Sequence, residues 1–184
     1  MLNKALKTNL LNIDLILEKA KISEGFKIGD LGCGRGGHFT FLSAEKVGKK
    51  GVVYAVDVMK NNLALITKEA KELNLPQITP VWSDIETYGG TKIDKESLDI
   101  IFLVNVLHES SKPLDIIKES LRLLKKSGKV VIADWKKISS PIGPELSARL
   151  NKETLISAVG KLGLSLEEEF EAGKYHFGLI FIKA

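Results

Sequence analysis

Short apolar runs recur along the chain and alternate with segments in which apolar residues repeat every three or four positions. The first pattern is typical of buried strands, and the second is typical of helices that pack on one face. The strand-like runs cover residues 26–31, 51–57, 78–82, 98–104 and 129–134. A helical spacing relates Leu63, Ile66, Ala70 and Leu73. The alternation predicts an α/β fold in three layers, a parallel sheet with crossover helices on both faces.

Two further strand-like runs, at 164–170 and 175–182, close the chain. Only residues 171–174 connect them. A parallel crossover needs a dozen or more residues, so this link is too short for one. The last two strands are therefore predicted to form an antiparallel hairpin.

The length and the pattern predict a single domain over residues 1–184. Residues 1–24 have the polar and apolar spacing of a helical leader, or cap, that precedes the first strand-like run. Residues 25–184 then form the core of the domain. The chain has no internal repeat, low-complexity tract or interdomain linker.

The first strand-like run ends in a dense glycine turn. Gly32 and Gly34 fit two cofactor-binding patterns, GxGxxG with Gly37 and GxGxG with Gly36. Asp30 lies two residues before the first of these glycines. Glycines let the backbone approach a ligand closely and adopt dihedral angles that a Cβ atom would forbid. The turn therefore predicts a nucleotide-like cofactor.

Acidic residues follow the next two strand-like runs. Asp57 ends the second run, 21 residues after Gly36, where a carboxylate can accept hydrogen bonds from both hydroxyls of a ribose. Asp84 follows the third run and is placed to meet the amino group of an adenine. The two acids favour an adenosine-containing cofactor.

The acid-glycine turn at Asp30, together with Asp57, Asp84, Asn105 and the final strand pair, resembles the class I S-adenosylmethionine-dependent methyltransferase family along nearly the whole chain. Within that family it is most similar to the small stand-alone members of the quinone-methyltransferase type. The resemblance implies a Rossmann-like sheet of seven strands in the order 3-2-1-4-5-7-6 with strand 7 antiparallel, and S-adenosyl-L-methionine as cofactor. The implied cofactor-binding residues are Asp30, Gly32, Cys33, Gly34, Gly36, Asp57, Val58, Asp84, Ile85 and Asn105.

Ligands of open parallel sheets bind outside the carboxyl ends of the strands. His108 follows the fourth strand-like run, and His176 begins the reversed last one, so both are expected at this rim together with His38. A histidine can serve as a base near neutral pH, which makes His108 and His176 the candidate catalytic residues. The histidines come from separate loops without the close spacing of metal ligands, so no metal site is predicted.

The favoured function is in-line methyl transfer to a small-molecule acceptor. A net charge of +4 keeps RNA, or a protein, open as the alternative acceptor. Much of this charge is predicted at the sheet edge opposite the rim, on Lys46, Lys49, Lys50, Lys125, Lys126 and Lys129. A cofactor-binding module without transferase activity and an NAD-dependent oxidoreductase are further alternatives, which cofactor binding would separate.

The composition fits an ordinary globular domain, with 44% apolar and 27% charged residues. The longest apolar stretches have the length of strands, so no membrane span or signal peptide is predicted, and a cytoplasmic location is expected. Cys33 is the only cysteine, which excludes an internal disulfide. The sequence identifies neither the methyl acceptor nor the oligomeric state.

Overall fold

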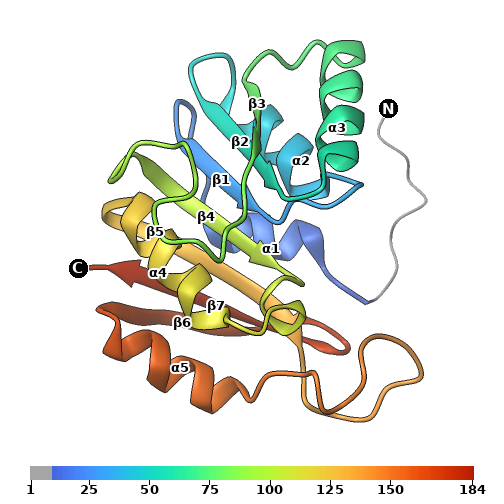
Figure 1. The fold of residues 1–184 in the computed structure, drawn as a ribbon, viewed down its shortest axis with the longest axis vertical. Coiled ribbons are helices and arrows are strands. Elements are labelled where there is room, and N and C mark those ends of the chain that lie inside the picture. The colour runs from blue at the N-terminus through green and yellow to red at the C-terminus, as the bar shows by residue number, and fades with distance from the viewer. Residues whose placement is uncertain (1–9) are drawn as a thin grey trace.

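A computed structural model describes residues 10–184, which form one mixed sheet of seven strands in the order β3-β2-β1-β4-β5-β7-β6 (Figure 1). The strand β7 is antiparallel to both of its neighbours, whereas the other pairs are parallel. The predicted order and the predicted final hairpin are therefore confirmed. The strands are β1 (Lys27–Leu31), β2 (Val52–Asp57), β3 (Ile78–Trp82), β4 (Leu98–Val104), β5 (Leu124–Trp135), β6 (Leu164–Gly173) and β7 (His176–Lys183).

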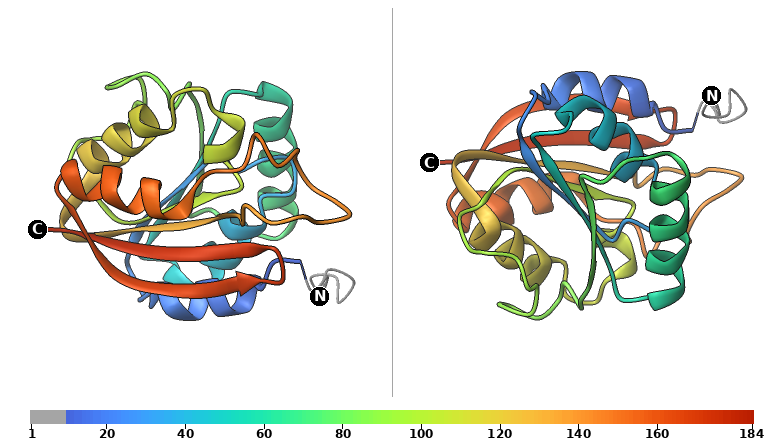
Figure 2. Two further views of the ribbon diagram at one scale, coloured as in Figure 1. Left: turned by 90° about the horizontal axis from the view of Figure 1, so that it is seen from below. Right: turned by 90° about the horizontal axis from the view of Figure 1, so that it is seen from above.

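Helices cover both faces of the sheet, as the edge-on views of Figure 2 show. Side chains of α1, α2 and α3 pack into one apolar cluster, and side chains of α4 and α5 pack into a second cluster on the opposite face. This arrangement gives the three predicted layers. The helices are α1 (Ile13–Ala20), α2 (His38–Val47), α3 (Lys60–Glu72), α4 (Pro113–Leu123) and α5 (Lys152–Lys161), with a short 3-10 helix, η2 (Leu107–Glu109).

The strand order reverses between β1 and β4. The strand β1 pairs with β2 on one side and with β4 on the other, and all three run in the same direction. Loops that leave neighbouring strands at such a point turn to opposite faces of the sheet and leave a crevice between them. The fold therefore places its natural ligand site beyond the carboxyl ends of β1, β2 and β4.

The burial of each element explains its sequence pattern. The strand β4 lies inside the sheet and is nearly all apolar because both of its faces are covered. The strand β3 lies at the edge, where Pro80 is tolerated because one side of an edge strand needs no ladder hydrogen bond. Of the predicted α3 stripe, Leu63, Ile66 and Ala70 are buried. Leu73 follows the end of the helix and is 40% exposed, so it does not belong to the stripe.

The strand β5 begins earlier than the sequence pattern predicts, at Leu124 instead of residue 129. Leu124 pairs with Leu98 of β4 across an irregularity in the ladder. In addition, the Lys183 ammonium donates hydrogen bonds to the carbonyl oxygens of Leu121 and Leu124, at 3.0 and 2.8 Å. Contacts with distant parts of the chain therefore extend a polar, lysine-rich segment into the sheet.

Part of the predicted leader lies outside the described residues, because the description begins at Leu10. The helix α1 packs on the sheet through Ile16 and Leu17, which are 0% and 4% exposed. Just before this helix, Asn12 N–H donates to the carbonyl oxygen of Ala172 at 2.7 Å. The start of the described chain is thus tied to the end of β6.

Candidate functional site

A cavity of about 540 Å³ opens at the point where the strand order reverses. Its wall is made by the glycine turn after β1, the end of β2, the start of the β3–β4 loop and the segment after β4. All but one of the predicted cofactor residues line it: Gly32, Cys33, Gly34, Gly36, Asp57, Val58, Asp84, Ile85 and Asn105. The remaining one, Asp30, lies behind the wall.

The glycine turn has a backbone that side chains would obstruct. Gly32 has φ +78°, and a Cβ atom there would lie 2.6 Å from Val106 Cγ2. Gly34 has φ +64° and open space beside it, so a side chain at this position would project away from the protein atoms around it. The turn is fixed to β2, because the N–H groups of Gly32 and Cys33 both donate to the carbonyl oxygen of Val56, at 2.8 and 3.0 Å.

The Asp57 carboxylate is held in place by three hydrogen bonds and by a longer contact with a thiol. Its Oδ2 atom accepts hydrogen bonds from Gly34 N–H at 2.9 Å and from Asn62 Nδ2 at 3.1 Å, and the Cys33 thiol lies 4.0 Å away. Its Oδ1 atom accepts from Met59 N–H at 2.7 Å. Because the carboxylate is only 7% exposed, these contacts fix it at the cavity wall.

Asp30 is buried directly behind the glycine turn and is 4% exposed. Its carboxylate accepts a hydrogen bond from the Thr40 hydroxyl at 2.5 Å. Burial raises the pKa of Asp30 to about 6, although the hydrogen bonds from Thr40 act in the opposite direction. Burial, helped by the charges of Asp30 and Asp57, also raises the pKa of the Cys33 thiol, which disfavours a nucleophilic role for this cysteine.

Asp84 is the second residue of the β3–β4 loop, residues 83–97. Its Oδ1 atom accepts from Glu86 N–H at 2.9 Å, and Glu86 in turn accepts from the Ser110 hydroxyl at 2.6 Å. This contact joins the loop to the segment before α4. The rim of the cavity is therefore closed beside Asp84, the residue that the sequence predicts to meet the adenine.

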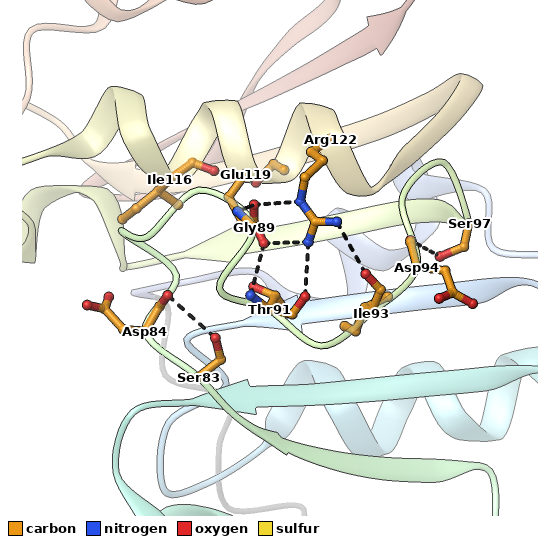
Figure 3. Close-up of polar contacts among 11 residues, drawn as sticks. Ser83, Asp84, Gly89, Thr91, Ile93, Asp94, Ser97, Ile116, Glu119 and Arg122 are labelled. Atoms are coloured by element: carbon orange, nitrogen blue, oxygen red, sulfur yellow. Dashed lines mark hydrogen bonds and ion pairs between the residues drawn. The ribbon is translucent and has the colours of Figure 1, made fainter.

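The same loop is anchored farther along by two residues of α4 (Figure 3). Glu119 is fully buried and accepts from the N–H groups of Gly89 and Thr91, at 2.7 and 3.1 Å. Arg122 pairs with Glu119 at 2.7 Å and donates to the carbonyl oxygens of Thr91 and Ile93, at 3.0 and 3.4 Å. Burial raises the pKa of Glu119, but the hydrogen bonds from Arg122 and the loop outweigh it and lower the pKa overall.

Asn105 follows β4 and has an unusual backbone, with φ +56°. Its N–H donates to the carbonyl oxygen of Ala133 at 2.8 Å, which fixes it to β5. Its side-chain oxygen is buried in the cavity wall and has no hydrogen-bond partner among residues 10–184. A buried acceptor without a partner is rare in folded proteins and is often satisfied by a ligand or by water.

His108 lies in η2, next to the cavity-lining residue Glu109. Its Nδ1 atom is 2.7 Å from Oδ1 of Asp134, and its N–H donates to Oδ2 of the same carboxylate at 3.2 Å. Asp134 is the penultimate residue of β5, is fully buried and also accepts from Trp135 N–H at 2.7 Å. The structure therefore brings His108 and Asp134 together at the ends of β4 and β5, beside the cavity.

His176 lies farther from the cavity and does not line it. It is 1% exposed, and its ring packs on Trp135 with 4.2 Å between the ring centroids. Its Nδ1–H donates to the carbonyl oxygen of Leu10 at 2.9 Å, and its Nε2 atom has no partner within the described part of the chain. The third histidine, His38, lines the cavity at the start of α2.

The β5–α5 loop, residues 136–151, is held together by Arg149, which is 4% exposed. All five guanidinium N–H groups donate hydrogen bonds, and all five acceptors are carbonyl or hydroxyl oxygens. The acceptors are the carbonyl oxygens of Lys136, Ile138, Ile142 and Pro144 and the hydroxyl of Ser140. The guanidinium also lies 5.1 Å from the centre of the Trp135 ring.

Several wall residues were not identified from the sequence. They are Met59, Asn62, Ser83, Glu86, Val104, Val106, Ser110 and Ile116. Asn62 occupies the first turn of α3, where its position five residues after Asp57 could have suggested a contact. The others carry ordinary side chains in ordinary segments, so no sequence signal marks them.

Within residues 10–184, no group of three or more His, Cys, Asp or Glu side chains is arranged to hold a metal ion. The helices of the described region are also too short, or too polar, to cross a membrane.

The sheet has seven strands, with the last strand reversed, and a cavity at its switch point is lined by a glycine turn and two acids. These features define a Rossmann-like domain of the class that binds nucleotide cofactors. Residues 22–170 match the Methyltransferase domain family, and the chain belongs to this family. The resemblance seen in the sequence is thereby confirmed, and with it S-adenosylmethionine as the cofactor of the family.

Two curated relatives show the range of this similarity. The chain is 32% identical to aklanonic acid methyltransferase DauC of Streptomyces sp. (strain C5), over 54% of this chain and 46% of the relative. It is 31% identical to the ubiquinone biosynthesis O-methyltransferase of Vibrio campbellii, over 66% of this chain and 49% of the relative. The chain thus spans about half the length of the curated relatives it matches.

The fold of a solved structure matches this chain over almost its whole length. The crystal structure of a SAM-dependent methyltransferase from Aquifex aeolicus superimposes with a TM-score of 0.85 at 26% identity, covering 96% of this chain and 92% of that one.

Proposed function

We propose that this chain is an S-adenosylmethionine-dependent methyltransferase that transfers the methyl group in line to a small-molecule acceptor. One observation carries the proposal: the glycine turn, Asp57 and Asp84 converge on a single cavity of about 540 Å³. Its volume falls within the roughly 300–1,000 Å³ that is usual for small-molecule and cofactor sites. Its position at the switch point is where an open parallel sheet binds nucleotides.

Asp57 is suited to bind the ribose. A carboxylate has about four acceptor sites, two on each oxygen. In Asp57, Oδ2 already accepts from Gly34 and Asn62, whereas Oδ1 accepts only from Met59. The free acceptor site on Oδ1 is available to a ribose hydroxyl, while the other three bonds hold the carboxylate in place.

Asp84, Val58 and Ile85 are suited to bind the adenine. Val58 is 59% exposed beside the cavity, so covering it with a flat ring would remove apolar surface from water. The Asp84 carboxylate is oriented by Glu86 N–H and lies at the mouth of the loop. It can accept a hydrogen bond from an amino group on the edge of that ring.

The other end of the cavity fits the methionine part of the cofactor. The open space beside Gly34 admits a ligand close to the backbone, and the unpartnered Asn105 oxygen offers an acceptor in the wall. Gly36 lines this end as well, and the buried Asp30 carboxylate lies behind the turn. Backbone N–H groups and acceptor oxygens of this kind can bind both charges of an amino acid.

When bound, S-adenosylmethionine supplies a methyl group that is already activated by the positive sulfur. The residues of the chain therefore need to hold the two reactants in line and to exclude water. The wall beside Asn105 contains Val104, Val106 and Ile116, which keep this part of the cavity apolar. A small-molecule acceptor is supported by the names of the relatives, which act on quinone precursors and on aklanonic acid.

Binding is tested with two matched glycine variants. Gly34 and Gly25 both have positive φ, +64° and +83°, and neither would bring a Cβ atom within 4 Å of another group. Gly34→Val and Gly25→Val therefore introduce similar backbone strain, but only Gly34 lines the cavity. We expect S-adenosylhomocysteine affinity to fall at least 100-fold in Gly34→Val and to stay near the wild-type value in Gly25→Val, as measured by calorimetric titration.

Thermal melting of both variants separates lost binding from lost folding. Equal affinity in the two folded variants would contradict a cofactor role for the turn. In the wild-type protein, S-adenosylhomocysteine at about 100 times its Kd should stabilise the native state by about 2.7 kcal/mol. Stabilisation by NAD in its place would favour an oxidoreductase.

A further inference from the structure

The two histidines at the rim have opposite surroundings. The Nδ1 atom of His108 faces the carboxylate of Asp134 at 2.7 Å. A carboxylate that already accepts from Trp135 N–H and His108 N–H acts as an acceptor, so the His108 proton lies on Nδ1. The Nε2 atom of His108 is therefore free of a proton and carries a lone pair. This is the arrangement of a histidine that is oriented by an acid and is ready to accept a proton.

His176 is oriented by a neutral group instead. Its Nδ1–H donates to the carbonyl oxygen of Leu10, which cannot compensate a positive charge on the ring as a carboxylate can. Its other face packs on Trp135, and its Nε2 atom is buried. Burial lowers the pKa of His176. This histidine therefore stays neutral and connects the last strand to the start of the described chain.

The charges around His108 favour its protonated form once a proton arrives. Burial lowers the pKa of His108, but the hydrogen bond and charge of Asp134, together with the charge of Glu109, outweigh it and raise the pKa overall. Arg149, from the β5–α5 loop, opposes this change. His176, from β7, is the remaining titratable neighbour, and it is neutral by the argument above.

His108 does not itself line the cavity, but its free Nε2 atom lies next to a residue that does. Its Nε2 atom is 3.9 Å from Oε1 of Glu109, whose side chain is 75% exposed and lines the cavity. Such an exposed carboxylate can turn away when a substrate enters. Asn105 and Val106, two and three residues before His108, line the same wall. His108 is thus adjacent to the side of the cavity where the methyl acceptor would lie.

We propose that His108 accepts the proton from a phenol-type or enol-type hydroxyl of the methyl acceptor, with Asp134 as its positioning residue and His176 in a structural role. This inference rests on the proposed methyltransferase function. In the step, the hydroxyl oxygen forms a bond to the methyl carbon as the bond from that carbon to sulfur breaks. The hydroxyl proton moves to Nε2 of His108, and the electron pair of the broken bond leaves with the neutral thioether.

The class of acceptor follows from the base. An imidazole removes a proton efficiently from a group whose pKa is within a few units of its own, as for a phenol near 10, and a general base of this kind contributes about 100-fold or more to the rate. An acceptor that is already a carboxylate has no proton to lose and would not need His108. The pair therefore distinguishes hydroxyl acceptors from carboxylate acceptors.

The first test is the protonation of the two rings in the wild-type protein. Imidazole nitrogen spectra, assigned with His108→Gln and His176→Gln, should show the proton on Nδ1 of both rings at neutral pH. On lowering the pH, His108 should gain its second proton at a higher pH than His176. A proton on Nε2 of His108, or the reverse order of titration, would overturn the proposal.

The second test is methyl transfer from labelled S-adenosylmethionine to the matched probes 2-naphthol and 2-naphthoate. We expect transfer to 2-naphthol, with kcat rising with pH as His108 loses its second proton. His108→Gln should lose about 100-fold in kcat and should lose this pH dependence, with a nearly unchanged Kd for S-adenosylhomocysteine. Asp134→Asn should move the rising limb to lower pH, and His176→Gln should lower kcat without moving that limb.

The outcomes distinguish failure of the methyltransferase function from failure of the role proposed for His108. A wild-type protein that does not bind S-adenosylhomocysteine refutes the methyltransferase function itself. A protein that binds it but methylates 2-naphthoate and not 2-naphthol, or neither probe, refutes the hydroxyl acceptor. An unchanged rate and pH profile in His108→Gln refutes the role of His108 as proton acceptor.

Discussion

The cavity at the ends of β1, β2 and β4 shares one edge of the sheet with a neighbouring surface at the end of β5 and the start of β7. The polar groups of the two regions find partners in different ways. In the cavity, Asp57 keeps an unused acceptor site, and the Asn105 oxygen has no partner within the described residues. At the second surface, Asp134 accepts three hydrogen bonds and Arg149 donates five. The first region is ready for a ligand, whereas the second is largely satisfied by its own chain.

An arginine anchors a loop in each region, but the two arginines bind different partners. Arg122 pairs with the buried carboxylate of Glu119 and ties the β3–β4 loop to α4. Arg149 binds only oxygens of its own β5–α5 loop. The β3–β4 loop is therefore tied to α4 by its arginine, whereas the arginine of the β5–α5 loop ties that loop to itself.

This difference predicts that substitutions in the two regions have different effects. The region around the cavity depends on contacts between elements, so substitutions there should affect ligand binding and folding together. The β5–α5 loop exposes Ile138, Ile142 and Leu146, and its internal bonds leave the cofactor cavity independent of it. We therefore expect substitutions in this loop to leave the cavity intact. Four predictions test this comparison.

Glu119→Gln should have the largest effect of the four, a loss of folding stability. It leaves the guanidinium of Arg122 largely buried without a carboxylate, and losing one partner of a buried pair costs about 3 kcal/mol or more. Urea denaturation at pH 7 measures this loss. Because the pKa of Glu119 is lowered in the folded state, its stabilisation is present above the unfolded pKa of 4.5 and is lost as the pH falls through the folded value. The difference between wild type and variant should therefore shrink in acid.

The matched control lies on the same helix. Asp115 and Lys118 form an ion pair with the same spacing as Glu119 and Arg122, but on the exposed face. We expect no measurable change in stability for Asp115→Asn. Equal effects of the two substitutions would show that the β3–β4 loop does not depend on its anchor.

Asp57→Ala should weaken the binding of S-adenosylhomocysteine. The loss of one hydrogen bond to a charged group is about 1.5–3 kcal/mol, which is roughly 10- to 150-fold in Kd. Some stability is lost as well, because the carboxylate also fixes Gly34. Asp99 is a matched control at the opposite edge of the sheet, since it too accepts a backbone N–H, from Lys27 at 2.7 Å. Calorimetric titration should show weakened binding in Asp57→Ala alone, and similar affinities in both variants would remove Asp57 from the site.

Cofactor binding should also depend on the ionisation of Asp30. Its pKa is raised to about 6 in the folded protein, so Asp30 gains a proton between pH 7 and pH 5. If its charge stabilises the positive cofactor, affinity should fall about tenfold over this range, since one pKa unit is about 1.4 kcal/mol. The same raised pKa means that Asp30 favours folding below its unfolded pKa of 3.8 and that this contribution is lost as the pH rises through about 6. Titrations of wild type and Asp30→Asn at several pH values test this, because the variant should show a flat profile.

Arg149→Met should have the smallest effect on cofactor binding, with no measurable change in affinity. It removes all five bonds within the β5–α5 loop, and Lys136 and Lys137 should then become more susceptible to trypsin. Arg149→Lys should give an intermediate rate, because an ammonium group has three donors in place of five. Mass spectrometry of limited digests measures this cleavage. Unchanged cleavage, or a large loss of cofactor affinity, would show that the two regions are not independent.

The sequence by itself determined the alternation of strands and helices, the final hairpin, and the glycine turn and acids that line the cavity. These features depend on local spacing: apolar periodicity, a short link, and a glycine turn with acids at the ends of strands. The strand order came from the resemblance to a known family, and the structure agrees with it. A residue such as Asp57 could be identified because the end of a parallel strand fixes its place at the rim.

Only the tertiary structure decided the partners of the charged side chains. Glu119 and Arg122 look like an ordinary helical ion pair until the loop at Gly89–Ile93 closes over them. His108 and His176 are equivalent in the sequence, yet one faces a carboxylate and the other a carbonyl oxygen. Such contacts join residues that are far apart in the chain, so no local pattern encodes them. Their energies depend on burial and on exact partners, which exist only once the sheet and its loops have assembled.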